Sequence, residues 1–235
     1  MHETTPNNSS GLGTPSVLAT LRALTPNRQL RFSEALRIAE LQANRLLELR
    51  GVSEAAVPNE VVTALPRITV EYEVDMPVSG ASCWDTACRT WVISLNALEA
   101  DTRHRFSLLH EYKHIIDHTR SEPIHTGSAR QTANEQAEQV ADYFAGCALM
   151  PKRLVKRAWG QGLQRPRDLA DLFDVSPLAM QVRLSQLGLT EPLRRCLPPP
   201  RTATRRTITP PHRRSYHRQL APIWPIPVPA VEARS

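Results

Sequence analysis

Two histidines one helical turn apart form the clearest chemical signal in the sequence. The segment "HEYKH", residues 110–114, fits the pattern H-E-x-x-H. Residues four apart on an α-helix share a face, so His110 and His114 can bind one metal ion, and Glu111 faces the ion's open position. Imidazole nitrogens and carboxylate oxygens are ligands that zinc takes in proteins. The pattern therefore predicts a catalytic zinc site on a helix.

A catalytic zinc ion needs a third protein ligand from a separate position. His118 continues the column of histidines, but it lies ~12 Å along the helix axis from His110, too far for one ion to bind both. In the next helical segment, "TANEQAEQVADYFAGCALMP", Thr132 and Glu135 form a T-x-x-E capping box. Glu138 has no such capping role and lies at the margin of the apolar face. It is the predicted third ligand.

Two further roles need side chains near this site. Asp142 follows Glu138 by one turn, and we expect it to accept a hydrogen bond from a histidine N–H. A donor for the oxyanion is also required, and the sequence leaves His118, His125 and Tyr143 open as candidates.

The elements that must position these residues follow from hydrophobic periodicity. The segment "SEALRIAELQANRLLELRG" predicts a helix with Ser33 as its N-cap and Gly51 as its C-terminal stop. The alternation in "PRITVEYEVD" predicts a half-buried strand with Ile68, Val70, Tyr72 and Val74 on one side. After a turn at residues 79–80, "TWVISLN" (90–96) predicts a second strand with an exposed edge. Helices are expected over about 101–118 and 132–149, after residue 151, and as a pair within 166–189. This order predicts an α+β fold.

The net charge of +6 belongs to one end of the chain. Residues 197–235 contain seven arginines, one glutamate and nine prolines, so the rest of the chain is neutral. We expect this Pro/Arg-rich segment to be disordered and to bind nucleic acid only weakly. No apolar run of about 18 residues and no signal-peptide pattern is present, so we expect a soluble, cytoplasmic protein without membrane contacts.

The segments "RHRFSLLHEYKHIIDH" and "EQVADYFAGCALMP" together resemble the ImmA/IrrE family of metallo-endopeptidases. The resemblance implies a zincin-like α+β domain with a small sheet and an HExxH helix. It implies His110, His114 and Glu138 as Zn²⁺ ligands and Glu111 as the general base. The implied substrate is a protein, a helix-turn-helix transcriptional repressor whose cleavage relieves repression. Lys113 departs from the family, in which a small residue is common.

The resemblance continues through "LADLFDVSPLAMQVRLSQLGL", which has a helix-turn-helix rhythm. We therefore expect a flexible leader (1–29), a zinc endopeptidase domain (30–160), a helix-turn-helix-like helical subdomain (161–190) and a disordered tail (191–235). Two alternative functions remain. One is a DNA-binding regulator that reads bases with the second helix of this segment, whose expected exposed residues are Gln181, Arg183 and Ser185. The other is an inactive adaptor that binds zinc.

Overall fold

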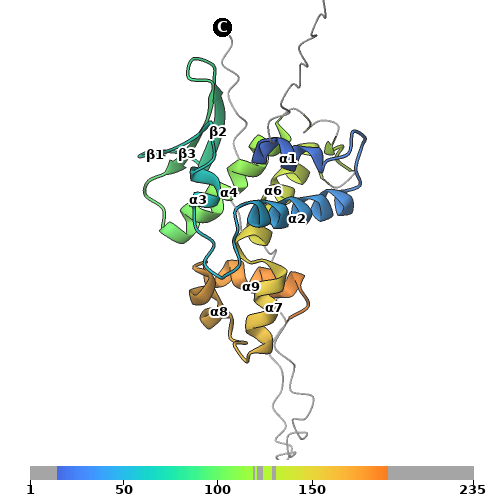
Figure 1. The fold of residues 1–235 in the computed structure, drawn as a ribbon, viewed down its shortest axis with the longest axis vertical. Coiled ribbons are helices and arrows are strands. Elements are labelled where there is room, and N and C mark those ends of the chain that lie inside the picture. Colours follow the sequence, from blue (N-terminus) through green and yellow to red (C-terminus); the bar gives the residue numbers. More distant parts are fainter. Residues whose placement is uncertain (1–14, 119, 121–123, 129–130, 190–235) are drawn as a thin grey trace, which may run out of the picture. The chain divides into compact units, whose positions relative to one another are not determined.

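The described residues of the computed structural model are 15–118, 120, 124–128 and 131–189. They form an α+β fold with a three-stranded mixed sheet (Figure 1). The N-terminal helices are α1 (Val17–Ala23), α2 (Phe32–Leu49) and α3 (Glu60–Thr63). The strands are β1 (Ile68–Glu73), β2 (Gly80–Asp85) and β3 (Thr90–Asn96). The later helices are α4 (Asp101–Asp117), α6 (Ala133–Leu149), α7 (Lys152–Gly160), α8 (Pro166–Phe173) and α9 (Pro177–Gln186).

The sheet order is β1-β3-β2, which differs from the sequence-based expectation in two ways. First, β3 is the central strand, parallel to β1 and antiparallel to β2, so the prediction of an exposed edge at residues 91–95 was wrong. Second, β2 was not predicted, because "GASCWD" has no alternation of large apolar residues. Among the described strands, β1 and β2 form the edges of the sheet.

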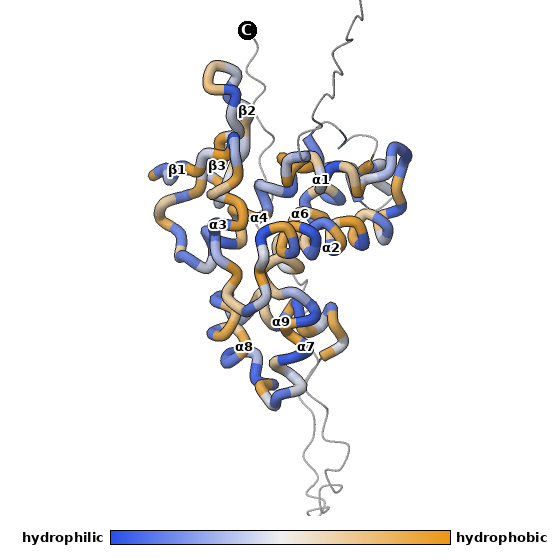
Figure 2. Tube along the Cα trace, in the orientation of Figure 1, coloured by the Kyte–Doolittle hydropathy of each residue, from blue (hydrophilic) through white to orange (hydrophobic). Residues whose placement is uncertain are grey.

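Helix α4 packs against both β2 and β3 and, with its other side, against α6. Strand β3 turns Trp91, Ile93 and Leu95 into the core, while the residues between them are only half-buried. Helix α6 also packs against α2. Figure 2 shows how apolar and polar residues interleave along these helices, as expected of elements with one buried side. The core therefore encloses α4, which carries the H-E-x-x-H segment.

Several local predictions can be compared with the structure. Gly51 has a φ of 68° directly after α2, which confirms it as the C-terminal stop. Ser33 was the wrong N-cap, because α2 begins at Phe32 and the N-cap position is Arg31, whose N–H donates to Glu34. In β1, Tyr72 is exposed, and Val74 lies beyond the strand end, so the predicted buried face stops at Val70.

The predicted domain boundaries remain predictions, with one correction. Residues 17–23, expected to be part of a flexible leader, form α1, because Leu21 is buried and Arg22 donates to the carbonyl oxygens of Ile115 and Ile116 in α4. The leader before residue 15 and the expected tail (191–235) lie outside the described residues. Helices α8 and α9 occupy the predicted helix-turn-helix-like segment. Ser176 caps α9 and accepts a hydrogen bond from the backbone N–H of Ala179.

Candidate metal centre

The side chains of His110, His114 and Glu138 converge between α4 and α6. The two histidine Nε2 atoms are 3.0 Å apart. Glu138 places Oε2 3.1 Å from Nε2 of His110 and Oε1 3.5 Å from Nε2 of His114. In a tetrahedral zinc site with bonds of about 2.0–2.1 Å, neighbouring ligand atoms are about 3.3 Å apart. The donor set and its spacing therefore fit a zinc ion, with one of the four positions left for water.

Asp142, one turn beyond Glu138 on α6, orients the first histidine. Its Oδ1 lies 2.8 Å from Nδ1 of His110. An Nδ1–H that donates to this carboxylate leaves Nε2 with its lone pair toward Glu138, which is the tautomer a metal ligand needs. The sequence-based expectation for Asp142 thus agrees with where the structure places it.

The electrostatics of the cluster favour a cation. Burial by itself lowers the pKa of His110, but hydrogen bonds with Asp142 and Glu138 outweigh burial and raise that pKa above its ordinary value. Burial opposes ionisation of Glu138 as well, yet its hydrogen bonds with His110 and His114 lower the pKa of this carboxyl group. Without a metal ion, a proton supplies the positive charge here, so metal and protons compete for the same atoms.

Glu111 lies on α4 beside the cluster and is held by the edge strand β2. Ser82 Oγ donates a hydrogen bond to Oε2 of Glu111 at 2.9 Å. Gly80, on the same side of β2, allows the close approach, because a Cβ there would lie 3.1 Å from Cγ of Glu111. The start of β2 is fixed in turn, since Ser79 Oγ donates to Glu99 and accepts from Arg103.

Ser82 was not among the residues predicted from the sequence. Gly80 and Ser82 are two residues apart, and small residues at that spacing indicate one strand face that another element approaches closely. This signal can be used only once 80–85 is identified as a strand.

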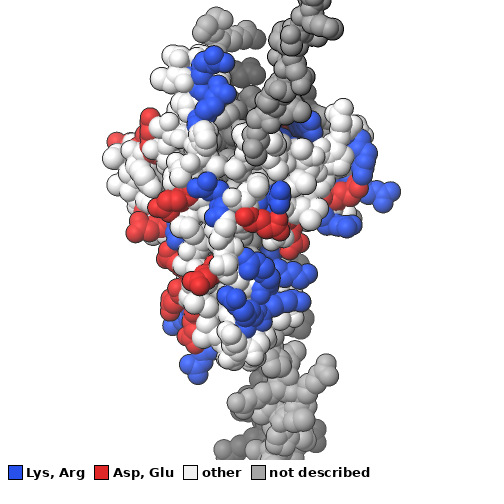
Figure 3. Space-filling view, in the orientation of Figure 1, with Lys and Arg blue, Asp and Glu red and all other residues white. Residues whose placement is uncertain are grey.

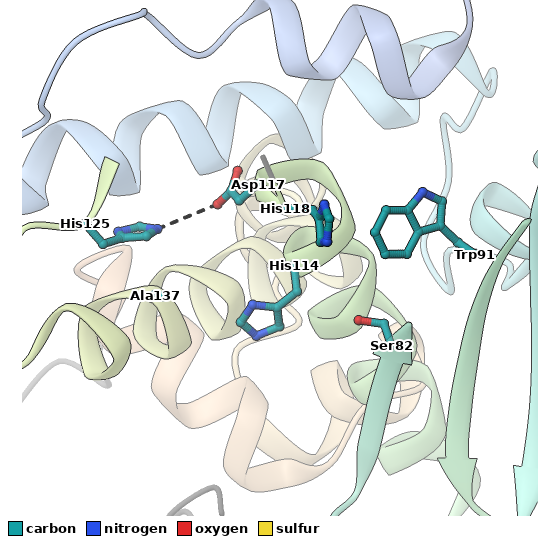
Figure 4. A pocket seen from close by; sticks show the side chains of 7 residues that line it. All are labelled: Ser82, Trp91, His114, Asp117, His118, His125 and Ala137. Atoms are coloured by element: carbon teal, nitrogen blue, oxygen red, sulfur yellow. Dashed lines mark ion pairs between the residues drawn. The ribbon is translucent and has the colours of Figure 1, made fainter. Parts of the chain in front are cut away.

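The structure places the three candidates for an oxyanion donor in different surroundings. The hydroxyl of Tyr143 lies 3.4 Å from Oε2 of Glu40 on α2. His118 packs edge to face on Trp91, with ring centroids 4.7 Å apart. His118 and the buried His125 both line a cavity that also contains His114 (Figure 4). Of the three candidate oxyanion donors, His118 and His125 therefore share a cavity with the candidate metal ligand His114, and Tyr143 is not among the residues that line it.

Lys113 has an ion-pair partner on its own helix. Its Nζ donates to both oxygens of Asp117, at 2.7 and 2.6 Å, and both side chains are buried. Nε2 of His125 lies 3.7 Å from Oδ2 of Asp117. Burial lowers the pKa of Lys113. Burial also acts to raise the pKa of Asp117, but the charges and hydrogen bonds of Lys113 and His125 together outweigh it and lower that pKa. The charge of Lys113 is therefore neutralised within the core.

The chain is similar to a known protein family and to solved structures. Residues 69–185 match the Peptidase_M78 family, described as the IrrE N-terminal-like domain. Among solved structures, the chain is similar to a Mycobacterium tuberculosis transcriptional regulator, at 18% identity and a TM-score of 0.48. That match covers 78% of this chain and 55% of the regulator, so this chain spans about half the regulator's length. No curated protein matches the chain in sequence.

Proposed function

The chain belongs to the Peptidase_M78 family, and we propose that it is a zinc-dependent endopeptidase that hydrolyses a peptide bond in a protein target. One observation carries the proposal. Three zinc-type donor atoms lie within 4.8 Å of one another, and the intervening Glu111 is held beside them by Ser82. This combination provides a metal site and a positioned base, which are the two parts that zinc-assisted hydrolysis requires.

Each residue has a defined role in the proposed reaction. His110, His114 and Glu138 hold the ion, which when bound acts as a Lewis acid toward water and the scissile carbonyl. Glu111 takes a proton from the attacking water at its carboxylate and passes it to the leaving amine. Ser82 keeps that carboxylate oriented by its hydrogen bond.

The substrate's path follows from the sheet order. Because β3 is paired on both sides, a peptide cannot add to it. The edge strand β2 lies against α4 and carries Ser82, so an extended peptide that pairs with β2 runs directly past Glu111. This mode selects targets with an extended or locally unfolded segment.

We propose a helix-turn-helix repressor as the target, from the resemblance of the chain to ImmA/IrrE endopeptidases, and the cytoplasm as the place of cleavage. Among the described residues, no helix is long and apolar enough to cross a membrane.

The test uses zinc-loaded protein and the repressor encoded nearest to it. We expect one discrete cut, stopped by a zinc chelator and restored by added zinc. His110→Ala, His114→Ala and Glu138→Ala should each lose most of the approximately one zinc per chain and the cleavage with it, because two protein ligands hold zinc weakly. His118→Ala is the control and should keep its zinc. Full zinc content in Glu138→Ala, measured by elemental analysis, would contradict the ligand assignment.

DNA binding is a second candidate function, and the structure changes the argument for it. Arg183, expected to be exposed on α9, is buried, because it donates to the carbonyl of Met150 and lies 3.7 Å from Glu40. Exposed polar residues on α9 are the uncharged Gln181, Ser185 and Gln186. Helix α7 has no acidic residue. It instead exposes four basic residues, which are Lys152, Arg153, Lys156 and Arg157. Figure 3 shows basic side chains gathered over this part of the molecule.

We expect α7 to make any DNA contact through phosphates rather than bases. Lys152→Ala/Lys156→Ala should then weaken binding to DNA of any sequence and reduce the slope of log K against log salt by about 2, since each lost phosphate contact removes about 0.9. Arg37→Ala/Arg45→Ala, which removes two exposed cations from α2, is the matched control and should leave the slope unchanged. Equal slopes for all three proteins, measured by fluorescence anisotropy, would exclude α7 as a DNA contact.

A further inference from the structure

The outer edge of β1 has no partner strand among the residues that the structure describes. The sheet order is β1-β3-β2, so β1 lies on the side of β3 that faces away from β2, the strand that holds Glu111. Figure 1 shows β1 as the outermost strand of the sheet. An edge strand presents a row of unpaired backbone groups to any extended chain that approaches it. The proposed reaction makes no use of this edge.

Hydrogen bonds at the two ends of β1 show which of its residues face outwards. Two N–H groups, one in β3 and one directly after it, donate to the carbonyl oxygens of Arg67 and Glu73. The N–H and C=O of one residue point to the same side of a strand, and that side alternates from each residue to the next. The odd-numbered residues of β1 therefore face β3. Val70 and Tyr72 turn their backbone donors and acceptors toward the open edge.

Three exposed apolar side chains gather at the carboxyl end of this edge. Tyr72, Val74 and Leu98 are 56%, 64% and 73% exposed, and only one other large apolar side chain in the described ranges is more than half exposed. The N–H of Ala97 donates to the carbonyl of Glu73 at 2.8 Å, which brings the segment that carries Leu98 beside the end of β1. Apolar side chains that are exposed together in this way mark a surface that binds another molecule.

The other face of β1 is acidic. Glu71 and Glu73 are exposed, and alternation along the strand puts them on the face opposite to that of Tyr72. No lysine or arginine ion pair of the described residues uses either carboxylate. Figure 3 shows acidic side chains over the flank where Figure 1 places β1. A second copy of β1 paired with this edge would bring glutamates together, so the edge does not suit self-association.

The two faces define what an added strand must carry. A strand that pairs with β1 places each side chain on the same face as the residue opposite to it. One set of its side chains therefore meets Glu71 and Glu73, and basic groups complement that set. The alternate set meets Tyr72, with Val74 and Leu98 beyond it, and apolar groups complement this second set.

We propose that the open edge of β1 is a docking site for a protein partner, and that it binds an extended segment of the partner in which basic and apolar residues alternate. Backbone hydrogen bonds to Val70 and Tyr72 provide affinity, and the side chains on the two faces select the sequence. Strand β3 separates this edge from β2 and the proposed base, so the proposal stands whether or not the chain is a protease.

The test measures binding of a labelled, capped peptide, Lys-Val-Lys-Val-Lys-Val, by fluorescence anisotropy on the full chain. Its length matches the six residues of β1. The control peptide, Val-Val-Val-Lys-Lys-Lys, has the same composition and no alternation. We expect the alternating peptide to bind about 10-fold more tightly than the control, because only it can place its charges on one face and its apolar groups on the other.

Charge variants locate the site on the protein. Glu71→Lys/Glu73→Lys should weaken binding of the alternating peptide by about 10- to 30-fold, because two attractions become repulsions. Asp168→Lys/Asp171→Lys makes the same change in net charge at exposed positions of α8 and should bind like wild type. Melting temperature checks that each variant folds, and Glu71→Gln/Glu73→Gln replaces the first variant if it does not.

A matched pair of leucine variants tests the apolar end of the site. Leu98→Ser should weaken binding by about 3- to 10-fold, as expected for loss of a side chain that is partly buried on binding. Leu41→Ser is the same substitution at a leucine of α2 that is 57% exposed, and it should have no effect.

N-methylated peptides test the backbone pairing. Only every second amide of a paired strand faces its neighbour. Methylation of one set of amides, those of the valines or those of the lysines, should therefore abolish binding, and methylation of the other set should leave it nearly unchanged. The docking site is overturned if the alternating peptide does not bind or binds no better than the control peptide. It is also overturned if binding survives the charge variants of β1 or responds alike to both methylated peptides.

Discussion

Glu111→Gln is expected to abolish detectable cleavage while leaving the fold and the zinc content unchanged. The substitution is nearly isosteric and removes only a proton acceptor, and loss of a positioned base typically lowers the rate by ~10²- to 10⁴-fold. Ser82 can still donate to the remaining amide oxygen, so the side chain keeps its place. The three donor atoms of His110, His114 and Glu138 are untouched.

Co-expression with the neighbouring repressor provides the measurement. A gel should show the repressor cut by wild type and intact with Glu111→Gln, and a reporter under the repressor's control should be derepressed only by wild type. Ser82→Thr, which keeps the hydroxyl donor, is the matched control and should retain most of the cleavage. If Glu111→Gln derepresses the reporter as fully as wild type and no fragment forms with either protein, the function is not proteolysis. A DNA-binding regulator or an inactive zinc adaptor would then explain the result.

Lys113→Met is expected to lower the free energy of unfolding by about 3–5 kcal/mol. The side chain fits the same space, but Asp117 is left as a buried carboxylate without its cation, and removing one partner of a buried pair has a cost of this size. For a domain of this length, the loss corresponds to a decrease in melting temperature of roughly 6–20 °C. Thermal and denaturant unfolding of the zinc-loaded protein measure it.

Two further variants test whether the loss of stability in Lys113→Met comes from the unpaired charge of Asp117. Lys113→Met/Asp117→Leu removes both charges and should recover most of the stability, because an apolar pair often replaces a buried ion pair without loss. Arg45→Ala breaks the exposed pair of Arg45 with Glu48 on α2 and should change stability by less than about 1 kcal/mol. A Lys113→Met protein as stable as Arg45→Ala would show that Asp117 does not depend on Lys113.

Local sequence patterns were sufficient to predict a residue's role wherever that role depends on its neighbours along one helix. The spacing of His110 and His114 places both imidazoles on the same side of α4, whatever packs around them. The capping box of Thr132 and Glu135 is likewise local, and the structure confirms it with a hydrogen bond from the Glu135 N–H to Thr132 Oγ1. Excluding Glu135 from the ligands therefore needed no knowledge of the fold.

Roles that depend on contacts between distant segments could not be read from the sequence. Strand β2 has no apolar alternation of its own and exists because it pairs with β3, so neither the strand nor Ser82 on it was found. The edge of the sheet was assigned to the wrong strand for the same reason, since strand order is set by pairing rather than by composition. Arg183 was expected at the surface because arginine usually lies there, but carbonyl and carboxylate partners on other helices hold it in the core.

The sequence alone predicted the fold class, six of the eight described helices (all but α1 and α3), the α4 histidine pair and the choice of Glu138 and Asp142 as its proposed partners. It could do so because helical periodicity and zinc's ligand preferences act at short range. Only the tertiary structure decided which strand lies beside Glu111, that the Lys113–Asp117 pair is buried in the core and that a cavity opens next to His114. The residues that form these features are up to tens of positions apart, and folding brings them together only because burial of the whole core is favourable.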